Sequence, residues 1–342
     1  MSELAEEKTS RLQPVSREQR EAGEARLAPM ATRSAESQGR ERSEHPDPYR
    51  TAFELDRDRV LHSKAFRRLK HKTQVFINPE GDHFVTRMSH TLQVTQVARA
   101  LAVALGLNEV LTEAICLAHD CGHTPFGHAG EAALSDYIDD GEWLHSEQGV
   151  RIFRILEPCN LTTEVLDGIR AHTWRVKPPP ATPEGWLCRF ADRIAYLNHD
   201  LRDALRAGVI SEGDVPAEVT QRLGPVNGRS WINAMVEAVI EESCRRGRVS
   251  MDAEVLLAMK HFREFMFERV YLRPEAQAQA ERARGVIHQL VDHLVAHPDQ
   301  VPASYRSAES DPLTRALDHV AGMTDRYALS LHDSLFRPHG LV

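Results

Sequence analysis

Apolar residues recur every three or four positions along most of this chain, which is the spacing of amphipathic α-helices. This spacing predicts a helix over residues 86–105, ended by Gly106, and a second helix with Asn108 as its N-cap. Their buried stripes are formed by Val94, Val97, Leu101 and Leu105, and by Leu111, Ala114, Ile115 and Ala118. Because the connection between them is short, the two helices are expected to be antiparallel neighbours.

The same periodicity predicts helices along the rest of the chain, with proline or glycine between them. They are expected over residues 130–140, 143–156, 162–172, 184–207, 229–245, 252–271, 275–297 and 312–336. Residues 72–76 fit a short strand or turn, and residues 177–185 a proline-rich loop. Alanine, leucine, glutamate and arginine dominate the composition, which also favours helix. The sequence therefore predicts an all-α fold.

The first 76 residues carry two charge patterns. Residues 1–46 are polar with almost no apolar periodicity, which predicts a disordered tail. Residues 49–76 predict a helix whose polar face is basic, either as a solvated face or as a phosphate-facing surface. The basic residues on that face are Arg57, Arg59, Lys64, Arg67, Arg68, Lys70 and Lys72. Because the formal net charge of the chain is −8, any such surface is local.

Residues 117–131, LAHDCGHTPFGHAGE, concentrate the candidate chemistry. His119 and Asp120 end a predicted helix, His123 and His128 follow on an irregular segment, and Glu131 opens the next helix. A solvent-exposed corner between helices is the simpler interpretation, but such a corner has no need for five ligands or proton carriers. Because Glu131 follows His128 by three residues, we expect it to orient the His128 imidazole.

His90 lies on the inward face at the start of one predicted helix, and His119 lies at the end of its antiparallel neighbour, so both are expected at one place. Asp192, Tyr196, Asp200 and Asp203 form a polar stripe on a later helix, which fits either a solvated face or a lined cavity. We therefore expect His90, His119, Asp120 and Asp192 to bind a divalent metal. Nitrogen and oxygen ligands suit Mn²⁺, Fe²⁺, Co²⁺, Zn²⁺ or, with water, Mg²⁺.

Cysteine usage and hydropathy bear on location. The five cysteines show no framework spacing, which favours a reduced, cytoplasmic protein. No stretch is apolar enough for a membrane span, and the N-terminus lacks the apolar region of a secretory signal.

Several motifs resemble the dGTPase-like deoxynucleoside triphosphate (dNTP) triphosphohydrolases of the HD phosphohydrolase superfamily. They are FRRLKHKTQVF, TRMSHTLQV, HDCGHTPFGHAGE, ADRIAYLNHDLRDA and AGMTDRYA, in the family's order. LAPMATRS at 27–34 also resembles the family, which argues against a disordered tail over residues 27–45. The resemblance implies an all-α HD-domain core over residues 49–210, a C-terminal helical region over 211–342 and a polar, partly disordered segment over 1–48.

This resemblance implies hydrolysis of a dNTP to a deoxynucleoside and inorganic triphosphate, by attack of metal-bound water on the α-phosphorus with Mn²⁺ or Mg²⁺. It matches His128 with Glu131 to the catalytic pair, and His90, His119, Asp120 and Asp192 to the metal ligands. It matches residues on the phosphate side to Arg87, His123, His145 and Arg193, and residues that contact the sugar to Gln74, Tyr196 and Asp200. Ser146 departs from the family's usual Asn, and Cys121 from an aliphatic residue.

Other functions fit part of this pattern. One alternative is another HD phosphohydrolase, such as a nucleoside 5′-monophosphatase or a cyclic-nucleotide or alarmone hydrolase. A second is a catalytically silent regulator that binds dNTPs or nucleic acid. The resemblance also implies a homo-oligomer, and a dNTP or single-stranded DNA bound to the basic segment is a candidate activator.

Overall fold

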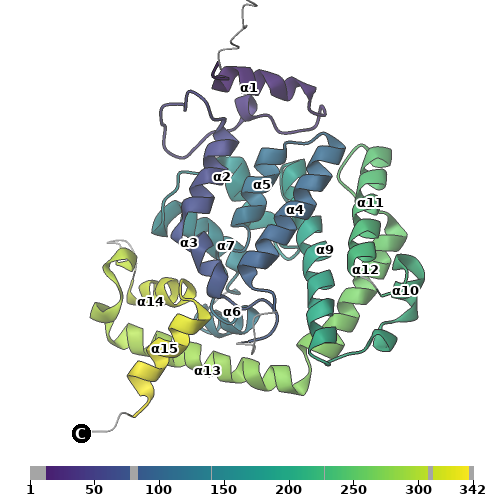
Figure 1. Cartoon of the computed structure of the whole chain (residues 1–342). Coiled ribbons are helices and arrows are strands. Elements are labelled where there is room, and N and C mark those ends of the chain that lie inside the picture. Colours follow the sequence, from purple (N-terminus) through teal and green to yellow (C-terminus); the bar gives the residue numbers. More distant parts are fainter. Residues whose placement is uncertain (1–12, 78–83, 140, 227, 307–310, 339–342) are drawn as a thin grey trace, which may run out of the picture.

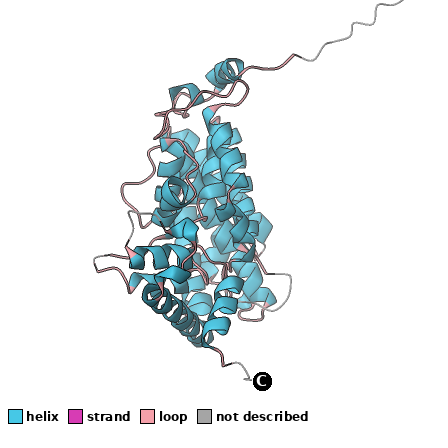
Figure 2. Cartoon of the chain, turned by 90° about the vertical axis from the view of Figure 1, so that its left-hand side faces the viewer, coloured by secondary structure: helices cyan, strands magenta, loops and turns pink. Residues whose placement is uncertain are grey.

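The structure is a computed structural model that describes residues 13–77, 84–139, 141–226, 228–306 and 311–338 (Figures 1 and 2). The described residues contain helices and isolated bridges but no β-strand, which confirms the all-α prediction. The α-helices are α1 (Arg17–Gly23), α2 (Ala52–His62), α3 (Lys64–Arg68), α4 (Arg87–Leu105), α5 (Glu109–Ala118), α6 (His128–Ser135), α7 (His145–Arg151), α8 (Thr163–Ala171), α9 (Pro183–Arg206), α10 (Ala217–Leu223), α11 (Gly228–Arg246), α12 (Ala253–Met266), α13 (Pro274–Ala296), α14 (Pro312–Ala321) and α15 (Asp325–Phe336).

Helices α4, α5 and α9 pack against one another at the centre, with α2 against α5 and α8 against α5 and α9 (Figure 1). Gly106 ends α4 in the left-handed conformation, with φ 64°, and the Asn108 side chain caps α5 by accepting from two backbone N–H groups. The short connection therefore makes α4 and α5 antiparallel, as predicted. It brings the start of α4 to the end of α5.

A second hydrophobic cluster joins the C-terminal helices to the lower end of the central bundle. Helix α13 runs across that end, and α6, α14 and α15 pack on it (Figure 1). Their buried residues include Phe126, Leu134, Ile287, Leu290 and Val320. The C-terminal region therefore covers the end of the molecule where the segment 117–131 lies.

The described part of the N-terminal segment is not the disordered tail that its composition predicts. Residues 17–23 form α1, and residues 28–40 bind the body of the protein. Buried Glu184 accepts from the backbone N–H (3.1 Å) and hydroxyl (2.8 Å) of Thr32, and Arg40 pairs with buried Asp56. Hydrogen bonds and ion pairs of polar side chains hold this segment on the protein. The prediction of disorder depended on the lack of apolar periodicity and did not consider such contacts. Residues 1–12 lie outside the described residues.

Several element predictions need adjustment. The helix expected over 312–336 is broken at residues 322–324 into α14 and α15, and α10 has no counterpart among the predicted helices. Residues 72–77 form bends with one bridge between Thr73 and Thr86, so they are a turn and not a strand. No helix among the described residues is long and apolar enough to cross a membrane. The domain boundaries at residues 48 and 210 stay predictions.

Candidate metal centre

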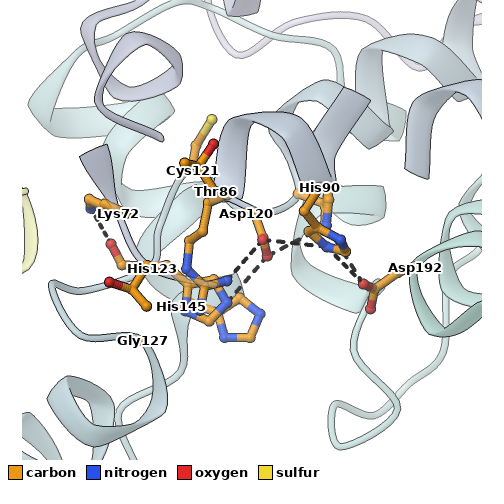
Figure 3. Close-up of polar contacts among 12 residues, drawn as sticks. Lys72, Thr86, His90, Asp120, Cys121, His123, Gly127, His145 and Asp192 are labelled. Carbon is orange, nitrogen blue, oxygen red and sulfur yellow. Dashed lines mark hydrogen bonds and ion pairs between the residues drawn. The ribbon is translucent and has the colours of Figure 1, made fainter. Parts of the chain in front are cut away.

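The four residues predicted as metal ligands come together from α4, the end of α5 and α9. His90 Nε2 lies 3.2 Å from Asp192 Oδ1 and 3.7 Å from Asp120 Oδ2. His119 Nε2 lies 3.5 Å from Asp120 Oδ1 and 3.9 Å from Asp192 Oδ1. One ligand atom each from His90, His119 and Asp120 falls within 4.8 Å of the others. Figure 3 shows His90 between the carboxylates of Asp120 and Asp192.

The hydrogen bonds of the two histidines leave their Nε2 atoms free to bind a metal. His119 Nδ1 donates to the Cys116 carbonyl oxygen at 2.6 Å, so its buried Nε2 keeps a lone pair and has no hydrogen-bond partner in the described structure. His90 Nδ1 lies 2.8 Å from His199 Nε2. We assign the proton between the two rings to His90 Nδ1. His199 Nδ1 lies 2.8 Å from Asp200 Oδ1, outside hydrogen-bond geometry, and the carboxylate favours a proton on that nitrogen. His199 Nε2 is then the acceptor for His90. Two imidazole nitrogens and two carboxylates fit a divalent cation.

Asp120 also contacts the residues on the other side of the centre. Its carboxylate accepts from Arg87 Nη1 at 3.0 Å, and His123 Nε2 lies 3.2 Å from it. Burial alone would raise the pKa of Asp120, but His119, His123 and Arg87 outweigh burial and hold that pKa well below its usual range. Asp120 is therefore ionised and divides the site into a metal side and a cationic side (Figure 3).

Glu131, His145 and His172 form a hydrogen-bonded row on the cationic side. Glu131 Oε1 accepts from His145 Nδ1 at 2.6 Å and from the His145 backbone N–H at 3.0 Å. His145 Nε2 lies 3.0 Å from His172 Nε2, and His172 Nδ1 donates to the Ile169 carbonyl oxygen at 2.7 Å. His172 Nε2 is therefore an acceptor, so His145 donates from both nitrogens and is an imidazolium.

The pKa values agree with this assignment. Burial lowers the pKa of His145, but the Glu131 carboxylate more than offsets burial and raises it above the usual value. Burial, with the charge on His145, lowers the pKa of His172 to about 3. Burial also lowers the pKa of His123, whose ring stacks on His145 with the centroids 3.7 Å apart. One charged histidine therefore lies between two neutral ones.

His128 does not have the partner that the sequence predicts. Its side chain is exposed at the start of α6, with its ring 5.8 Å from that of His123. Glu131 hydrogen-bonds to His145 and does not hydrogen-bond to His128. The i, i+3 spacing placed both residues on α6, but the turn before the helix directs the His128 ring outward. Gly127 permits this turn: its φ is 57°, and a Cβ there would lie 2.7 Å from Arg87 Nη2.

Two of the three residues expected to contact a sugar, Tyr196 and Asp200, lie on α9. Asp200 accepts from the Tyr271 hydroxyl at 2.6 Å, and the half-buried Tyr196 lies on the same face of α9. The Arg193 guanidinium stacks on the Trp174 ring, 4.4 Å from its centroid. Gln74 Oε1 is buried without a hydrogen-bond partner in the described structure. Tyr196 and Asp200 follow the candidate ligand Asp192 on α9 by four and eight residues. The substrate contacts of all these residues stay predictions.

Three residues of this site were not predicted from the sequence: His172, His199 and Tyr271. His172 and His199 are each the single histidine of the predicted helices over residues 162–172 and 184–207, so no local cluster marked them. Tyr271 follows His199 by 72 residues and lies in the helical turn Phe267–Tyr271, which continues α12. The packing of α12 against α9 brings Tyr271 to Asp200.

The predicted basic surface is smaller than the sequence suggests. Arg57 pairs with Asp58 and Arg59 with Glu44, while Lys72 is buried. Of the seven basic residues named for this surface, Lys64, Arg67 and Lys70 are exposed. The basic face, for which a solvated face and a phosphate-facing surface were both open, is therefore partly neutralised within the chain.

Comparison with known proteins gives the family. The HD domain family matches residues 87–197, and the phosphohydrolase-associated domain family matches residues 249–334. A deoxyguanosinetriphosphate triphosphohydrolase-like protein of Caldanaerobacter subterraneus subsp. tengcongensis is 47% identical over 318 residues, covering 91% of this chain and 93% of the relative. Proteins of the same name from Clostridium perfringens and Desulfatibacillum aliphaticivorans are 42% and 40% identical, and each alignment covers 92% of this chain and at least 95% of the relative. The chain therefore belongs to the deoxyguanosinetriphosphate triphosphohydrolase-like family of HD-domain phosphohydrolases.

Proposed function

We propose that this protein hydrolyses dNTPs, dGTP among them, to a deoxynucleoside and inorganic triphosphate at the α-phosphorus. The observation that carries the proposal is the division of the site around Asp120. A set of metal ligands lies on one side, and Arg87 and protonated His145 lie on the other. A polyphosphate needs both features, because its negative charge must be neutralised while its α-phosphorus is attacked by water.

The cation held by His90, His119, Asp120 and Asp192 is proposed to be Mn²⁺ or Mg²⁺, with Fe²⁺, Co²⁺ and Zn²⁺ as alternatives. When bound, it supplies Lewis acidity and lowers the pKa of water. The hydrogen bond from His119 Nδ1 to the Cys116 carbonyl oxygen fixes the tautomer of His119 that can hold the cation through Nε2. The contact of His90 Nδ1 with His199 fixes the same tautomer of His90.

The cationic side is proposed to bind the phosphates. Arg87 is buried, and its Nε and Nη2 atoms have no hydrogen-bond partner in the described structure, so they are available to a phosphate oxygen. His145 adds a second positive charge, which Glu131 maintains. Arg193 is proposed to leave the Trp174 ring and contact the phosphate tail.

His128 is proposed to transfer a proton to the leaving 5′-oxygen or to align the attacking water. Its exposed ring is accessible to a substrate, while His123 beside it is buried and neutral. His123 is therefore proposed to contact phosphate as a neutral donor. These roles follow the chemistry of the residues, and the His128→Ala variant tests the first of them.

The sugar is proposed to lie against α9. Tyr196 would stack on the ribose face and exclude a 2′-hydroxyl, while Asp200 and Gln74 would bind its remaining polar atoms. The unpartnered Gln74 Oε1 and the Asp200 carboxylate are the acceptors that such a sugar hydroxyl requires.

Three further properties are proposed from the family. The protein is expected to be a cytoplasmic homo-oligomer, and a dNTP or single-stranded DNA is a candidate activator. Size-exclusion chromatography with light scattering tests the assembly. A salt-dependent binding assay tests the DNA, because counterion release makes phosphate binding weaken with salt.

Incubation with each dNTP and Mn²⁺ or Mg²⁺, with products separated by ion-exchange chromatography, tests the proposed reaction. Triphosphate and deoxynucleoside are the expected products. Release of orthophosphate or pyrophosphate would contradict attack at the α-phosphorus. If no dNTP is consumed, even with dNTP mixtures or single-stranded DNA added, the proposal fails, and the monophosphate, cyclic-nucleotide and alarmone substrates are next.

A further inference from the structure

The turn between α14 and α15, residues 321–325, contacts the segment that carries the site histidines. Asp325 is the first residue of α15 and is buried. Its carboxylate accepts from the Thr73 backbone N–H at 2.9 Å, from the Thr73 hydroxyl, and from the Phe126 backbone N–H at 3.0 Å. A side chain from the C-terminal helices therefore binds the backbone of the loop between His123 and His128.

This loop has a backbone conformation that needs to be held. Phe126 has φ 61°, a left-handed conformation that bulky residues rarely adopt. Its amide donates to Asp325, and its ring is buried in the cluster formed with α13, α14 and α15. The left-handed residue comes two positions before His128, so its φ and ψ set the direction in which α6 begins.

Lys72 makes a second connection at the same place. Its buried side-chain nitrogen donates to the His123 carbonyl oxygen (Figure 3) and, at 3.1 Å, to the Ala321 carbonyl oxygen. The backbone N–H of Arg87 in turn donates to the Lys72 carbonyl oxygen at 3.2 Å. The turn 321–325, residues Lys72–Thr73 and the loop 123–127 thus form one hydrogen-bonded unit.

We propose that Asp325 is a positioning residue: through the Phe126 amide and Thr73 it fixes the loop that places His123 and His128 in the site. Asp325 hydrogen-bonds to none of the four metal-ligand residues, so its effect is on turnover and not on metal binding. The C-terminal helical region thereby becomes part of the catalytic apparatus. This inference rests on the proposed function only where turnover of a dNTP is the measurement.

Asp325→Asn tests the proposal, with Asp333→Asn as the matched control. Asp333 is an exposed aspartate of the same helix, and its neighbour is Arg337 at 3.7 Å. In Asp325→Asn, kcat is expected to fall about 10- to 100-fold, since a misplacement of about 1 Å can cost about 100-fold. The KM and the Mn²⁺ affinity are expected to stay at wild-type values. Asp333→Asn should match the wild type in all three.

Hydrogen–deuterium exchange with residue-level fragmentation supplies a measurement that needs no substrate. The Phe126 amide is expected to exchange faster in Asp325→Asn than in the wild type or in Asp333→Asn. Unchanged exchange at Phe126, or a kcat equal to that of the wild type, would overturn the proposal. If the wild type hydrolyses no dNTP, the proposed reaction fails, while the exchange experiment still decides the role of Asp325.

A variant that keeps the charge covers the case in which Asp325→Asn does not fold. Asp325→Glu retains a carboxylate at the start of α15, where the helix dipole favours it, but displaces that carboxylate by one methylene. A folded Asp325→Glu protein with reduced kcat and unchanged metal affinity supports positioning. Wild-type kcat in this variant, with unchanged exchange at Phe126, contradicts it.

Discussion

Replacing Glu131 by glutamine tests which histidine this carboxylate serves. The sequence spacing assigns Glu131 to His128, whereas the structure places its Oε1 atom 2.6 Å from His145 Nδ1. Glutamine keeps the size and an acceptor oxygen but removes the negative charge beside the imidazolium. We expect His145 to lose its proton at a lower pH in this variant, because Glu131 is the main group that raises its pKa.

The size of the effect follows from the contact. A hydrogen bond to a charged group contributes about 1.5–3 kcal/mol, and an opposite charge near 3 Å in a buried site is at the upper end of that range. If that interaction acts on the transition state, kcat/KM falls about 10- to 100-fold, at about 1.4 kcal/mol for each factor of ten. The alkaline limb of the pH–rate profile is expected to move to lower pH, since the protonated form of His145 is then lost earlier.

Two double-mutant cycles turn this expectation into an assay. With dGTP and Mn²⁺, kcat/KM is measured for Glu131→Gln alone and in combination with His145→Ala or with His128→Ala. If Glu131 acts through His145, adding Glu131→Gln to His145→Ala costs little more. The same change added to His128→Ala should retain most of its own effect.

The reverse pattern would refute this reasoning. A Glu131→Gln effect that disappears in the His128→Ala background and persists in the His145→Ala background would show that Glu131 works through His128. An alkaline limb that does not move would show that the protonation of His145 is not what Glu131 provides. Circular dichroism of each variant checks that the loss of activity is not a loss of fold.

His128→Ala is expected to lower kcat about 100- to 10,000-fold, to a low but measurable rate, while leaving Mn²⁺ binding by isothermal titration unchanged, and wild-type activity would contradict its assignment. His119→Ala is expected to lose Mn²⁺ binding, because the buried Nε2 lone pair disappears, and a chelator should inactivate the wild type until Mn²⁺ is restored. Asp318→Ala removes the carboxylate that accepts from Arg151 Nε at 2.8 Å and from Arg151 Nη2 at 2.7 Å. Urea titration should show a free energy of unfolding lower by about 1–3 kcal/mol. An unchanged free energy of unfolding would show that water fully replaces Asp318 as the partner of the half-exposed Arg151.

Local signals in the sequence were sufficient for the central helices. Asn108 and Gly106 mark the boundary between α4 and α5 through capping, and the apolar stripes predict which faces are buried. The break between α14 and α15 was missed because their apolar periodicity runs on, while Thr324 caps a new helix. The N-terminal segment was misjudged because Glu184, the buried carboxylate that binds Thr32, lies 152 residues further along the chain.

The metal side of the site follows from helical spacing, but the cationic side does not. His90 and His119 lie at adjacent ends of antiparallel helices, a relation that periodicity alone establishes. The partner of Glu131 depends instead on the close approach of α7 to the turn at Gly122, where a Cβ would lie 2.0 Å from the His145 carbonyl oxygen. Such an approach brings together residues 14 positions apart across a loop, and no local pattern in the sequence encodes it.

The tautomers of the histidines explain why the two sides of Asp120 differ. Backbone carbonyl oxygens fix His119 and His172 in the same way, so each directs an Nε2 lone pair into the site. At His119 that lone pair faces the carboxylates of Asp120 and Asp192, an arrangement that could hold a cation. At His172 the lone pair instead accepts from His145, whose second proton Glu131 retains.

The same imidazole geometry therefore yields a candidate metal ligand on one side and a charged hydrogen-bond donor on the other. Because the hydrogen bonds that fix each role exist before any substrate arrives, the site is organised for an anion that bridges the two sides. An anion would match both sides of the site with one phosphate oxygen beside Arg87 and His145 and the remaining phosphate near His90 and His119. A substrate with no negative charge would leave the buried Arg87 Nε and Nη2 atoms without an anionic acceptor, and this is the physical reason to expect selection of a nucleotide over a nucleoside.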